Sequence, residues 1–280
     1  MLRCGSFSLS LERPLVMGIV NLTPDSFSGD GVGVDVASAV EHARRQIDAG
    51  ADLLDLGAES SRPGAIPASL DEELARLLPV LDALKDCGVP ISIDTYKPEV
   101  MRAALDAGAT MINDIYGFRW PGAIDAVRER DCALCVMHMQ GEPLTMQQQP
   151  HYEDVVGEVA EFLRQRVAVL DAAGIARDRV LLDPGFGFGK TLDHNLSMLA
   201  ELGTFAASGL PLLIGVSRKS MLGALTGRPV DQRMAASVAA ALLATDAGAH
   251  IVRVHDVAAT RDALAVWAAL RAKRAAMVGP

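Results

Sequence analysis

Aromatic residues are scarce in this chain of 280 residues: they make up 4% of it, although 50% of the residues are hydrophobic. A chain of this length buries a large core, so that core must consist mainly of aliphatic side chains, alanine and methionine. Positive charge is also in deficit, with 26 Lys and Arg against 35 Asp and Glu and a net charge of -9. This balance argues against general nucleic-acid binding, which needs a basic face, and confines any anionic substrate to a local positive cluster.

Cysteines are few, and their spacing does not indicate a disulfide scaffold. Cys132 and Cys135 form a C-x-x-C pair, while Cys4 and Cys87 stand alone. The pair could bind a metal or carry redox chemistry, but no second pair of ligands accompanies it. We favour two small apolar residues of a buried strand, with side chains on opposite faces. The N-terminus lacks the apolar core of a signal peptide, and no apolar run is long enough to cross a membrane. A reducing, cytoplasmic location is therefore expected.

Short aliphatic runs alternate with longer amphipathic stretches. The expected strands are Val16–Val20, Leu53–Gly57, Ile91–Asp94, Met111–Asp114, Ala133–Met137, Val180–Asp183, Leu212–Val216 and Ile251–Val254. Strands that are apolar on both faces are typical of a parallel sheet covered by helices. Units of about 32 residues predict a single α/β domain over residues 1–280, with a (β/α)8 TIM barrel at 16–275. A short N-terminal β-hairpin within residues 1–15 would cap its bottom. A doubly wound open sheet is the alternative, but no G-x-G-x-x-G follows the first strand.

Several helix boundaries are also marked in the sequence. The apolar positions of Glu153–Ala173 fall on one helical face. Pro98 stands where a first helical turn would begin and Gly108 where that helix would stop. The sequence Asp-Ala-Gly-Ala recurs at 48–51, 106–109 and 246–249, each time between a predicted helix and a predicted strand. The repetition supports a repeated helix-to-strand unit.

Polar side chains stand at most of the predicted strand ends. A single Asp or Asn there is more often a helix N-cap than a ligand. In a barrel, however, all carboxyl ends of the strands meet at one mouth, where active sites lie. Asp94, Asn113 and Asp183 can read the donor and acceptor edge of a flat nitrogen heterocycle. The groups suited to phosphate oxygens or a ring carbonyl are Lys219, Arg253 and His255. Since no nucleophilic triad and no His/Cys metal cluster stands out, the chemistry is expected to rest on binding and electrostatics.

Taken together and in order, these segments resemble dihydropteroate synthase. The motifs that carry the resemblance are Met17–Ser28, Glu59–Gly64, Ile93–Thr95, Ile112–Ile115, Met137–Gly141, Asp183–Thr191, Ser217–Ser220 and Arg253–Asp256. Each alone is weak, but the ordered set is highly specific and runs through almost the whole chain. One departure lies in the first loop, which reads Ser28-Gly29-Asp30-Gly31 where the family usually has S-D-G-G. The role of Asp30 is therefore open.

The resemblance implies a folate-biosynthesis transferase and sulfonamide target that joins 6-hydroxymethyl-7,8-dihydropterin diphosphate to 4-aminobenzoate, releasing 7,8-dihydropteroate and diphosphate. By motif, the pterin would be held by Asp94, Asn113, Asp183 and Lys219, with Ile115 and Met137 flanking its ring. The diphosphate would be held by Asn21, Arg253 and His255, with Asn21 acting through Mg²⁺. The 4-aminobenzoate pocket would be bordered by Ser61, Arg62, Pro63, Phe188 and Ser220. The residues expected to act in catalysis are Asp94, Asp183, Lys219, Arg253 and His255. The family also suggests a homodimer.

Diphosphate departure before amine attack is the expected mechanism, because the electron-rich dihydropterin ring can delocalise a cation. The amine of 4-aminobenzoate is neutral at physiological pH, so little base catalysis is needed. Three alternatives stay open: a pterin-binding methyltransferase module that serves a corrinoid partner, a non-catalytic paralogue, and a generic phosphate-binding barrel isomerase. The loop motifs favour the synthase.

Overall fold

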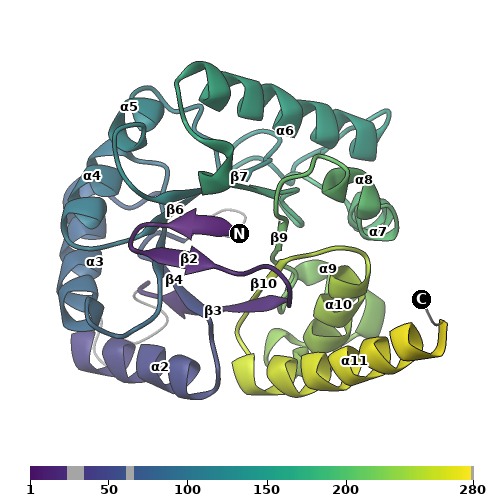
Figure 1. Ribbon diagram of the computed structural model, residues 1–280. Helices are drawn as coiled ribbons and strands as arrows, with labels where there is room; N and C mark the ends of the chain where they lie inside the picture. The colour runs from purple at the N-terminus through teal and green to yellow at the C-terminus, as the bar shows by residue number, and fades with distance from the viewer. Residues whose placement is uncertain (24–34, 61–65, 279–280) are drawn as a thin grey trace.

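The computed structural model describes residues 1–23, 35–60 and 66–278. Its centre is an eight-stranded parallel sheet in the order β8-β7-β6-β5-β4-β3-β10-β9 (Figure 1). The strands are β3 Leu15–Asn21, β4 Leu53–Gly57, β5 Ile91–Asp94, β6 Met111–Asp114, β7 Ala133–Met137, β8 Val180–Asp183, β9 Leu213–Ile214 and β10 Ile251–Val254. A parallel bridge between Leu182 and Leu212 joins the two outer strands of this order. The expected (β/α)8 barrel is thereby confirmed.

Helices surround the strands as an outer ring (Figure 1). They are α2 Val36–Asp48, α3 Leu70–Leu84, α4 Pro98–Asp106, α5 Ala123–Val127, α6 Val155–Ala172, α7 Leu192–Ala200, α8 Gly203–Ala206, α9 Ser220–Thr226, α10 Met234–Asp246 and α11 Val257–Val278, with short 3-10 turns at Arg177–Arg179 and Val230–Gln232. Local sequence explains several helix starts. Ser69 and Glu72 form a capping box at α3, and Asp154 accepts a hydrogen bond from the Gly157 amide at α6.

Most of the strand and helix predictions are confirmed. The predicted bounds hold for β4 to β8 and for β10, and α4 begins at Pro98 as expected. The glycine of each repeated Asp-Ala-Gly-Ala segment has a positive φ, +104° in the case of Gly108, so the repeat does mark left-handed helix ends. The strand predicted at Leu212–Val216 is shorter, because beyond Ile214 the chain leaves the ladder. It turns toward α9 through a hydrogen bond from the Lys219 amide to the Val216 carbonyl.

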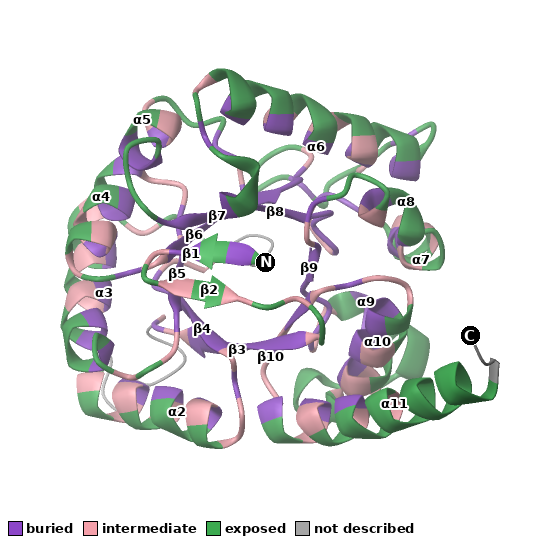
Figure 2. Cartoon of the chain, viewed as in Figure 1, coloured by how far each residue is buried: buried purple, intermediate pink, exposed green. Residues whose placement is uncertain are grey.

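An N-terminal hairpin of β1 Leu2–Cys4 and β2 Phe7–Leu9 closes one end of the barrel. It lies across the central strands in Figure 1, and the strands behind it are buried while part of β2 faces solvent (Figure 2). One apolar cluster joins Leu2 and Cys4 to inward-facing strand residues, namely Leu15, Met17, Leu53, Met111, Ala133, Cys135, Leu181, Leu213 and Ile251. These lie mainly at the starts of the strands, so the hairpin covers the bottom of the barrel as predicted.

The cysteines serve packing in this fold. Cys132, directly before β7, belongs to the cluster between the strands and the helices, whereas Cys135 belongs to the cluster inside the barrel. Their side chains thus lie on opposite faces, as the sequence indicated, and all four cysteines are free thiols. Within residues 1–23, 35–60 and 66–278, no helix is both long and apolar enough to span a membrane.

Candidate active site

The barrel interior changes from apolar to polar along its axis. Residues two positions apart in a strand share a face, and each of four apolar bottom residues is followed two positions later by a polar one. Leu53, Met111, Leu181 and Ile251 are buried in the bottom cluster. The polar residues that follow them at this offset are Asp55, Asn113, Asp183 and Arg253. Parallel strands therefore place these four side chains on one inner surface, toward the carboxyl-end mouth.

Strand register brings further predicted residues to the same level. Asn21 of β3 pairs with Gly57 of β4, Gly57 pairs with Asp94 of β5, and Asp94 pairs with Asn113 of β6. Gly57 has no side chain, and a Cβ built there would lie 3.6 Å from Asp94 Cβ. The mouth thus carries Asn21, Asp94 and Asn113 side by side, although 92 positions separate the first from the last in the sequence.

Arg253 joins two carboxylates from neighbouring strands. Its Nε donates to Asp55 Oδ2 at 2.6 Å, and its Nη2 donates to Asp94 Oδ2 at 3.1 Å. Burial alone would lower the pKa of Arg253, but these two carboxylates outweigh burial and raise it. Burial raises the pKa of Asp94 to about 7, with Arg253 opposing the shift and Asp55 adding to it. Arg253 is therefore positively charged, and its hydrogen bonds to Asp55 and Asp94 fix the orientation of its guanidinium group.

Asp55 was missed in the sequence analysis. It is fully buried in β4 and also accepts a hydrogen bond from Asn113 Nδ2 at 3.3 Å. Asp55 was overlooked because it lies inside the strand rather than at its end. The signal that could have found it is a charged residue at an inward position of an otherwise apolar strand, where an unpaired charge would be costly.

Three buried polar atoms of this layer have no hydrogen-bond partner within the described part of the chain. They are Asp55 Oδ1, Ser92 Oγ and Asn113 Oδ1. Buried polar groups are almost always paired, so an unpaired set on one inner surface indicates a place where water or a polar ligand completes the bonding. Two of the three atoms are acceptors only, which fits a ligand that presents N–H groups.

Asp183 and Lys219 form the other side of the mouth. Asp183 Oδ1 accepts from the Gly185 amide at 2.7 Å, and Lys219 Nζ donates to the Phe186 carbonyl. Burial lowers the pKa of Lys219 to about 8, opposed mainly by Asp183. Burial likewise raises the pKa of Asp183, and Lys219 is the strongest opposing influence. A carboxylate and an ammonium group, both partly desolvated, thus act on each other in this part of the mouth, and each favours the charged form of the other.

Apolar groups line the space beside these charges. Ile115 and Met137 belong to one cluster with Met139 and Met146, against which Phe188 packs. Lys219 Nζ lies 4.6 Å from the centroid of the Phe188 ring, within the range of a cation–π contact. The predicted ring-flanking pair Ile115 and Met137 and the predicted pocket residue Phe188 are therefore brought together. Polar edges with apolar walls are what a flat heterocycle requires.

Three of the scarce aromatic residues gather at the edge of this cluster. Tyr96 and Tyr116 have ring centroids 4.8 Å apart, and Trp120 lies 5.1 Å from the first and 5.5 Å from the second. Both tyrosines pack against the cluster of Ile115 and Met137. Asp114 shapes this corner by accepting from the amides of Tyr116 and Phe118 at 2.8 and 2.7 Å. Asp114 thus stabilises the turn after β6 and is not a helix N-cap, since the N-cap of α5 is Gly122; as the neighbour of Asn113 in the strand, it points to the opposite face.

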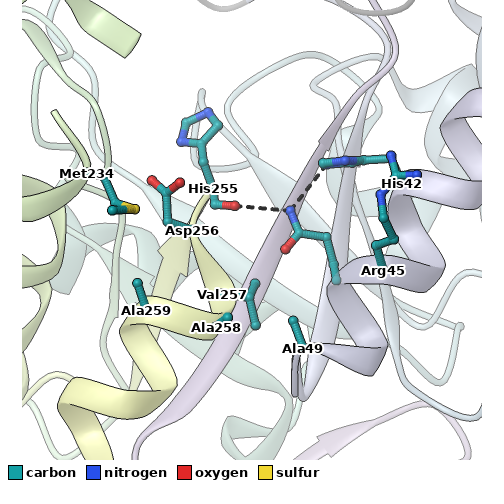
Figure 3. A pocket seen from close by; sticks show the side chains of 10 residues that line it. His42, Arg45, Ala49, Met234, His255, Asp256, Val257, Ala258 and Ala259 are labelled. Atoms are coloured by element: carbon teal, nitrogen blue, oxygen red, sulfur yellow. Dashed lines mark hydrogen bonds between the residues drawn. The ribbon is translucent and has the colours of Figure 1, made fainter. Parts of the chain in front are cut away.

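His255, after β10, is braced from two directions. Its Nδ1 contacts Ser217 Oγ at 3.0 Å, and its carbonyl accepts from Gln46 Nε2 of α2 at 3.2 Å. Gln46 Nε2 also lies 3.2 Å from His42 Nε2, and these groups border a cavity of about 320 Å³ that extends to the start of α11 (Figure 3). The imidazole is therefore tied to the segment after β9, which also carries Lys219.

The predicted site residues divide into three groups. Contacts, packing or register bring together Asn21, Asp94, Asn113, Ile115, Met137, Asp183, Phe188, Lys219, Arg253 and His255. Ser220 begins α9 next to Lys219, and its side chain is exposed. Ser61, Arg62 and Pro63 lie outside the described residues, as do Asp30 and the glycines around it. The chemistry that the first group supports is binding of a polar flat ring next to an anion, with stabilisation of charge in both.

Comparisons with known proteins agree with this chemistry. A family model described as "Pterin binding enzyme" matches residues 17–255. Dihydropteroate synthase of Escherichia coli (strain K12) is 50% identical over 260 residues, which is 92% of each chain. Dihydropteroate synthase of Burkholderia cenocepacia, solved with 7,8-dihydropteroate, is 56% identical with a TM-score of 0.90, covering 98% of this chain and 97% of that one. The Yersinia pestis enzyme, solved with a sulfonamide drug complex, is 46% identical with a TM-score of 0.92, covering 97% and 99%.

Proposed function

Since the chain belongs to the dihydropteroate synthase family, we propose that the polar mouth of its barrel is the site of this transferase reaction. The enzyme condenses 6-hydroxymethyl-7,8-dihydropterin diphosphate with 4-aminobenzoate and releases 7,8-dihydropteroate and diphosphate. The relatives decide against a methyltransferase module and against a generic barrel isomerase. What remains to be assigned is the role of each residue.

We assign the pterin to the inner layer of the mouth. Asn113 Oδ1 and Asp183 would accept from the amino and ring N–H groups of the heterocycle, and Lys219 would donate to its carbonyl oxygen and ring nitrogen. The single observation that carries this assignment is the unpaired buried Asn113 Oδ1, next to Asp55 and level with Asp94. Ile115 and Met137 supply the apolar surface on which the ring would lie.

The diphosphate would bind at the rim, where Arg253 and His255 supply donors. Asn21 fits magnesium, because its amide oxygen is a hard ligand at the open end of β3, beside Gly57. Magnesium commonly takes only one or two protein ligands and completes its shell with water and substrate phosphates. Within the described part of the chain, no three His, Cys, Asp or Glu residues form a metal cluster, and a single amide ligand is compatible with that. When bound, the ion would neutralise charge on the departing diphosphate.

The 4-aminobenzoate would lie between Phe188 and the start of α9, with Ser220 at its border and Ser61, Arg62 and Pro63 completing the pocket by family resemblance. The half-buried Phe188 ring, held under Lys219, gives the benzene ring an apolar face. Sulfonamides, which mimic 4-aminobenzoate, would compete for the same place.

We propose that diphosphate leaves before the amine attacks. Asp94 and Asp183 would stabilise a developing positive charge on the dihydropterin, and the Arg253 donors that Asp55 and Asp94 do not use would bind the departing anion. Groups already oriented in this way need not reorganise during reaction, which is why such electrostatic terms tend to dominate catalysis. The attacking amine is neutral, and the proton it loses once the C–N bond has formed can pass to water or to the released diphosphate, so little base catalysis is required of the chain.

The decisive experiment is a coupled assay of diphosphate release with both substrates. We expect release to require 4-aminobenzoate and to be inhibited by a sulfonamide. A non-catalytic paralogue would instead bind the pterin diphosphate without turnover, and this result would contradict the proposal. Isothermal titration with the pterin diphosphate alone separates the two outcomes.

We also propose that the enzyme is a homodimer that works in the cytoplasm. Large apolar side chains are exposed on two neighbouring helices of the described chain, including Leu243 of α10 and Val266 and Leu270 of α11. The C-terminal half of α11 extends beyond the barrel with an exposed surface (Figure 2). Four free thiols suit a reducing compartment. Sedimentation velocity of the wild type and of Leu243→Glu with Val266→Glu would test the dimer, which the charged pair should dissociate.

A further inference from the structure

The segment between β8 and α7 contacts residues that follow two other strands, β7 and β9, and holds Lys219 in place. The Phe186 carbonyl accepts from Lys219 Nζ, and the Phe188 ring lies under the same ammonium group. A side chain at Gly187 would meet the Lys219 stem at 3.2 Å. The position of Lys219 therefore depends on the shape of residues 184–189, which contain three glycines and make no regular hydrogen-bond ladder.

Lys190, at the end of this segment, is a buried lysine that the reaction does not use. Its side chain is 3% exposed, and Nζ donates to the Gly185 carbonyl at 3.0 Å and to the Phe188 carbonyl at 3.0 Å. The third contact of Nζ is His138 Nδ1, at 2.9 Å. Burial lowers the pKa of Lys190 to about 7. In the ammonium form, Nζ has three N–H donors, so each donor has one acceptor. Two acceptors lie at opposite ends of the 184–189 segment, and the third lies on the segment after β7.

His138 is suited to accept from this lysine. Burial lowers the pKa of His138 to about 2, with Lys190 adding to the shift, so the imidazole is neutral and one ring nitrogen is free to accept. Its ring packs edge-on against Phe162 at 4.8 Å between centroids. The acceptor is thus fixed to α6 and β7, which belong to the rigid wall of the barrel.

The backbone of residues 184–189 packs closely against residues 138–140, which follow β7. Gly185 has φ +72°, and a Cβ built there would lie 1.8 Å from the His138 carbonyl oxygen. At Gly189, with φ +62°, a Cβ would lie 2.5 Å from the Gln140 carbonyl oxygen. The segment therefore approaches residues 138–140 more closely than any side chain would permit. This close approach of the backbone places the carbonyl oxygens of Gly185 and Phe188 next to Lys190 Nζ.

We propose that Lys190, with His138 as its acceptor, is a positioning residue that sets the Phe186 carbonyl and the Phe188 ring, and through them Lys219, for binding of both substrates. Burying an ammonium group is costly unless every donor is satisfied. An unbranched apolar residue such as methionine would fill the same volume without that cost. Unlike such a residue, the lysine gathers three acceptors that no apolar side chain can hold. This inference rests on the proposed function for the identity of the substrates.

The first test is Lys190→Met, with Lys85→Met as the matched control, since Lys85 at the C-cap of α3 is exposed and its ion-pair partner among the described residues is Asp82 of that helix. We expect the KM values for 4-aminobenzoate and for the pterin diphosphate to rise on the order of tenfold or more, because a misplacement of about 1 Å can cost about a hundredfold. The control should keep both KM values. A merely structural lysine would lower the fraction of folded enzyme, and so the apparent kcat, while leaving both KM values unchanged. That result would overturn the proposal.

A second pair of variants keeps the test valid if Lys190→Met does not fold. His138→Asn retains an acceptor close to the position of Nδ1, whereas His138→Leu retains apolar volume against Phe162. We expect the KM values of His138→Asn to lie closer to the wild type than those of His138→Leu. The reverse order would show that packing, and not the acceptor, is what matters.

Nitrogen NMR of the wild type adds a readout without any substitution. We expect an unprotonated Nδ1 and a protonated Nε2 on His138 at neutral pH. A protonated Nδ1 would show that His138 is not the acceptor of Lys190 and would overturn the proposal. If the wild type itself shows no diphosphate release, the proposed function fails instead, and the NMR result still decides the contact.

Discussion

Replacing Asp55 by asparagine should remove one charge from the site and almost nothing else. Asp55 Oδ2 accepts from Arg253 Nε at 2.6 Å and from Asn113 Nδ2 at 3.3 Å, while Oδ1 has no partner among the described residues. An asparagine can place its amide oxygen where Oδ2 lies and its NH₂ group where Oδ1 lies. Both contacts then persist, and only their charge-assisted part is lost.

The magnitude follows from these contacts. A hydrogen bond to a charged partner contributes about 1.5–3 kcal/mol and a neutral one about 0.5–1.5 kcal/mol. Arg253 keeps Asp94 as a partner, so Asp55→Asn should lower the free energy of unfolding by about 1–2 kcal/mol. Asp55→Ala also removes the acceptor and opens a gap beside a buried charge, and should cost about 3–5 kcal/mol. Because Asp55 helps to raise the pKa of Asp94, both variants should lower that pKa.

Urea unfolding of the ligand-free protein measures the first effect, with Asp82→Asn as control because Asp82 is 75% exposed and, within the described part of the chain, its ion-pair partner is the exposed Lys85. The pH dependence of kcat/KM for the pterin diphosphate measures the second, since it reports groups of the free enzyme. The acid limb should move to lower pH in Asp55→Asn. If this variant is as stable as the control and its acid limb is unmoved, Asp55 does not hold Arg253 and the account of the charged layer is wrong.

Three further predictions concern the reaction itself. Lys219→Ala and Asp183→Asn should each lower turnover on the order of a hundredfold or more with an unchanged far-ultraviolet circular dichroism spectrum, and near-normal turnover in both would refute the assigned site. In the wild type, kcat/KM should fall above the Lys219 pKa of about 8, because the ammonium is lost there, and below the Asp94 pKa of about 7, because the carboxylate is protonated there. Excess chelator should stop diphosphate release and added magnesium should restore it, whereas full activity in chelator would remove the metal from the scheme.

Much of the fold could be predicted because a covered parallel sheet leaves a strong local signal. β4 to β8 and β10 are aliphatic runs bounded by turn residues, and each has the predicted bounds. The strand predicted at Leu212–Val216 was longer than β9, because the point at which a strand leaves the sheet depends on its hydrogen bonds to the neighbouring strand. Leu212 still bridges to Leu182, but after Ile214 the backbone bonds within its own turn.

The sequence predicted those site residues that the barrel topology alone brings together. Strand-end residues such as Asp94 and Asp183 must meet at the mouth of a barrel, whatever their distance in sequence. Asp55 and Lys190 were missed as functional residues for different reasons. The inward direction of Asp55 follows only from strand register. The contacts of Lys190 depend on the path of a glycine-rich segment, which no periodicity describes.

The cluster of Tyr96, Tyr116 and Trp120 gives the protein an intrinsic fluorescence probe. The chain has two tryptophans, and Trp267 donates to Asp246 from α11, on the outer helical layer. Trp267→Phe would leave Trp120 as the single indole emitter, within 5.5 Å of both Tyr96 and Tyr116. Light absorbed by these tyrosines would be passed to Trp120, and both pack on the wall beside the ring-binding layer. Fluorescence of this one residue would follow substrate arrival in real time without any attached dye.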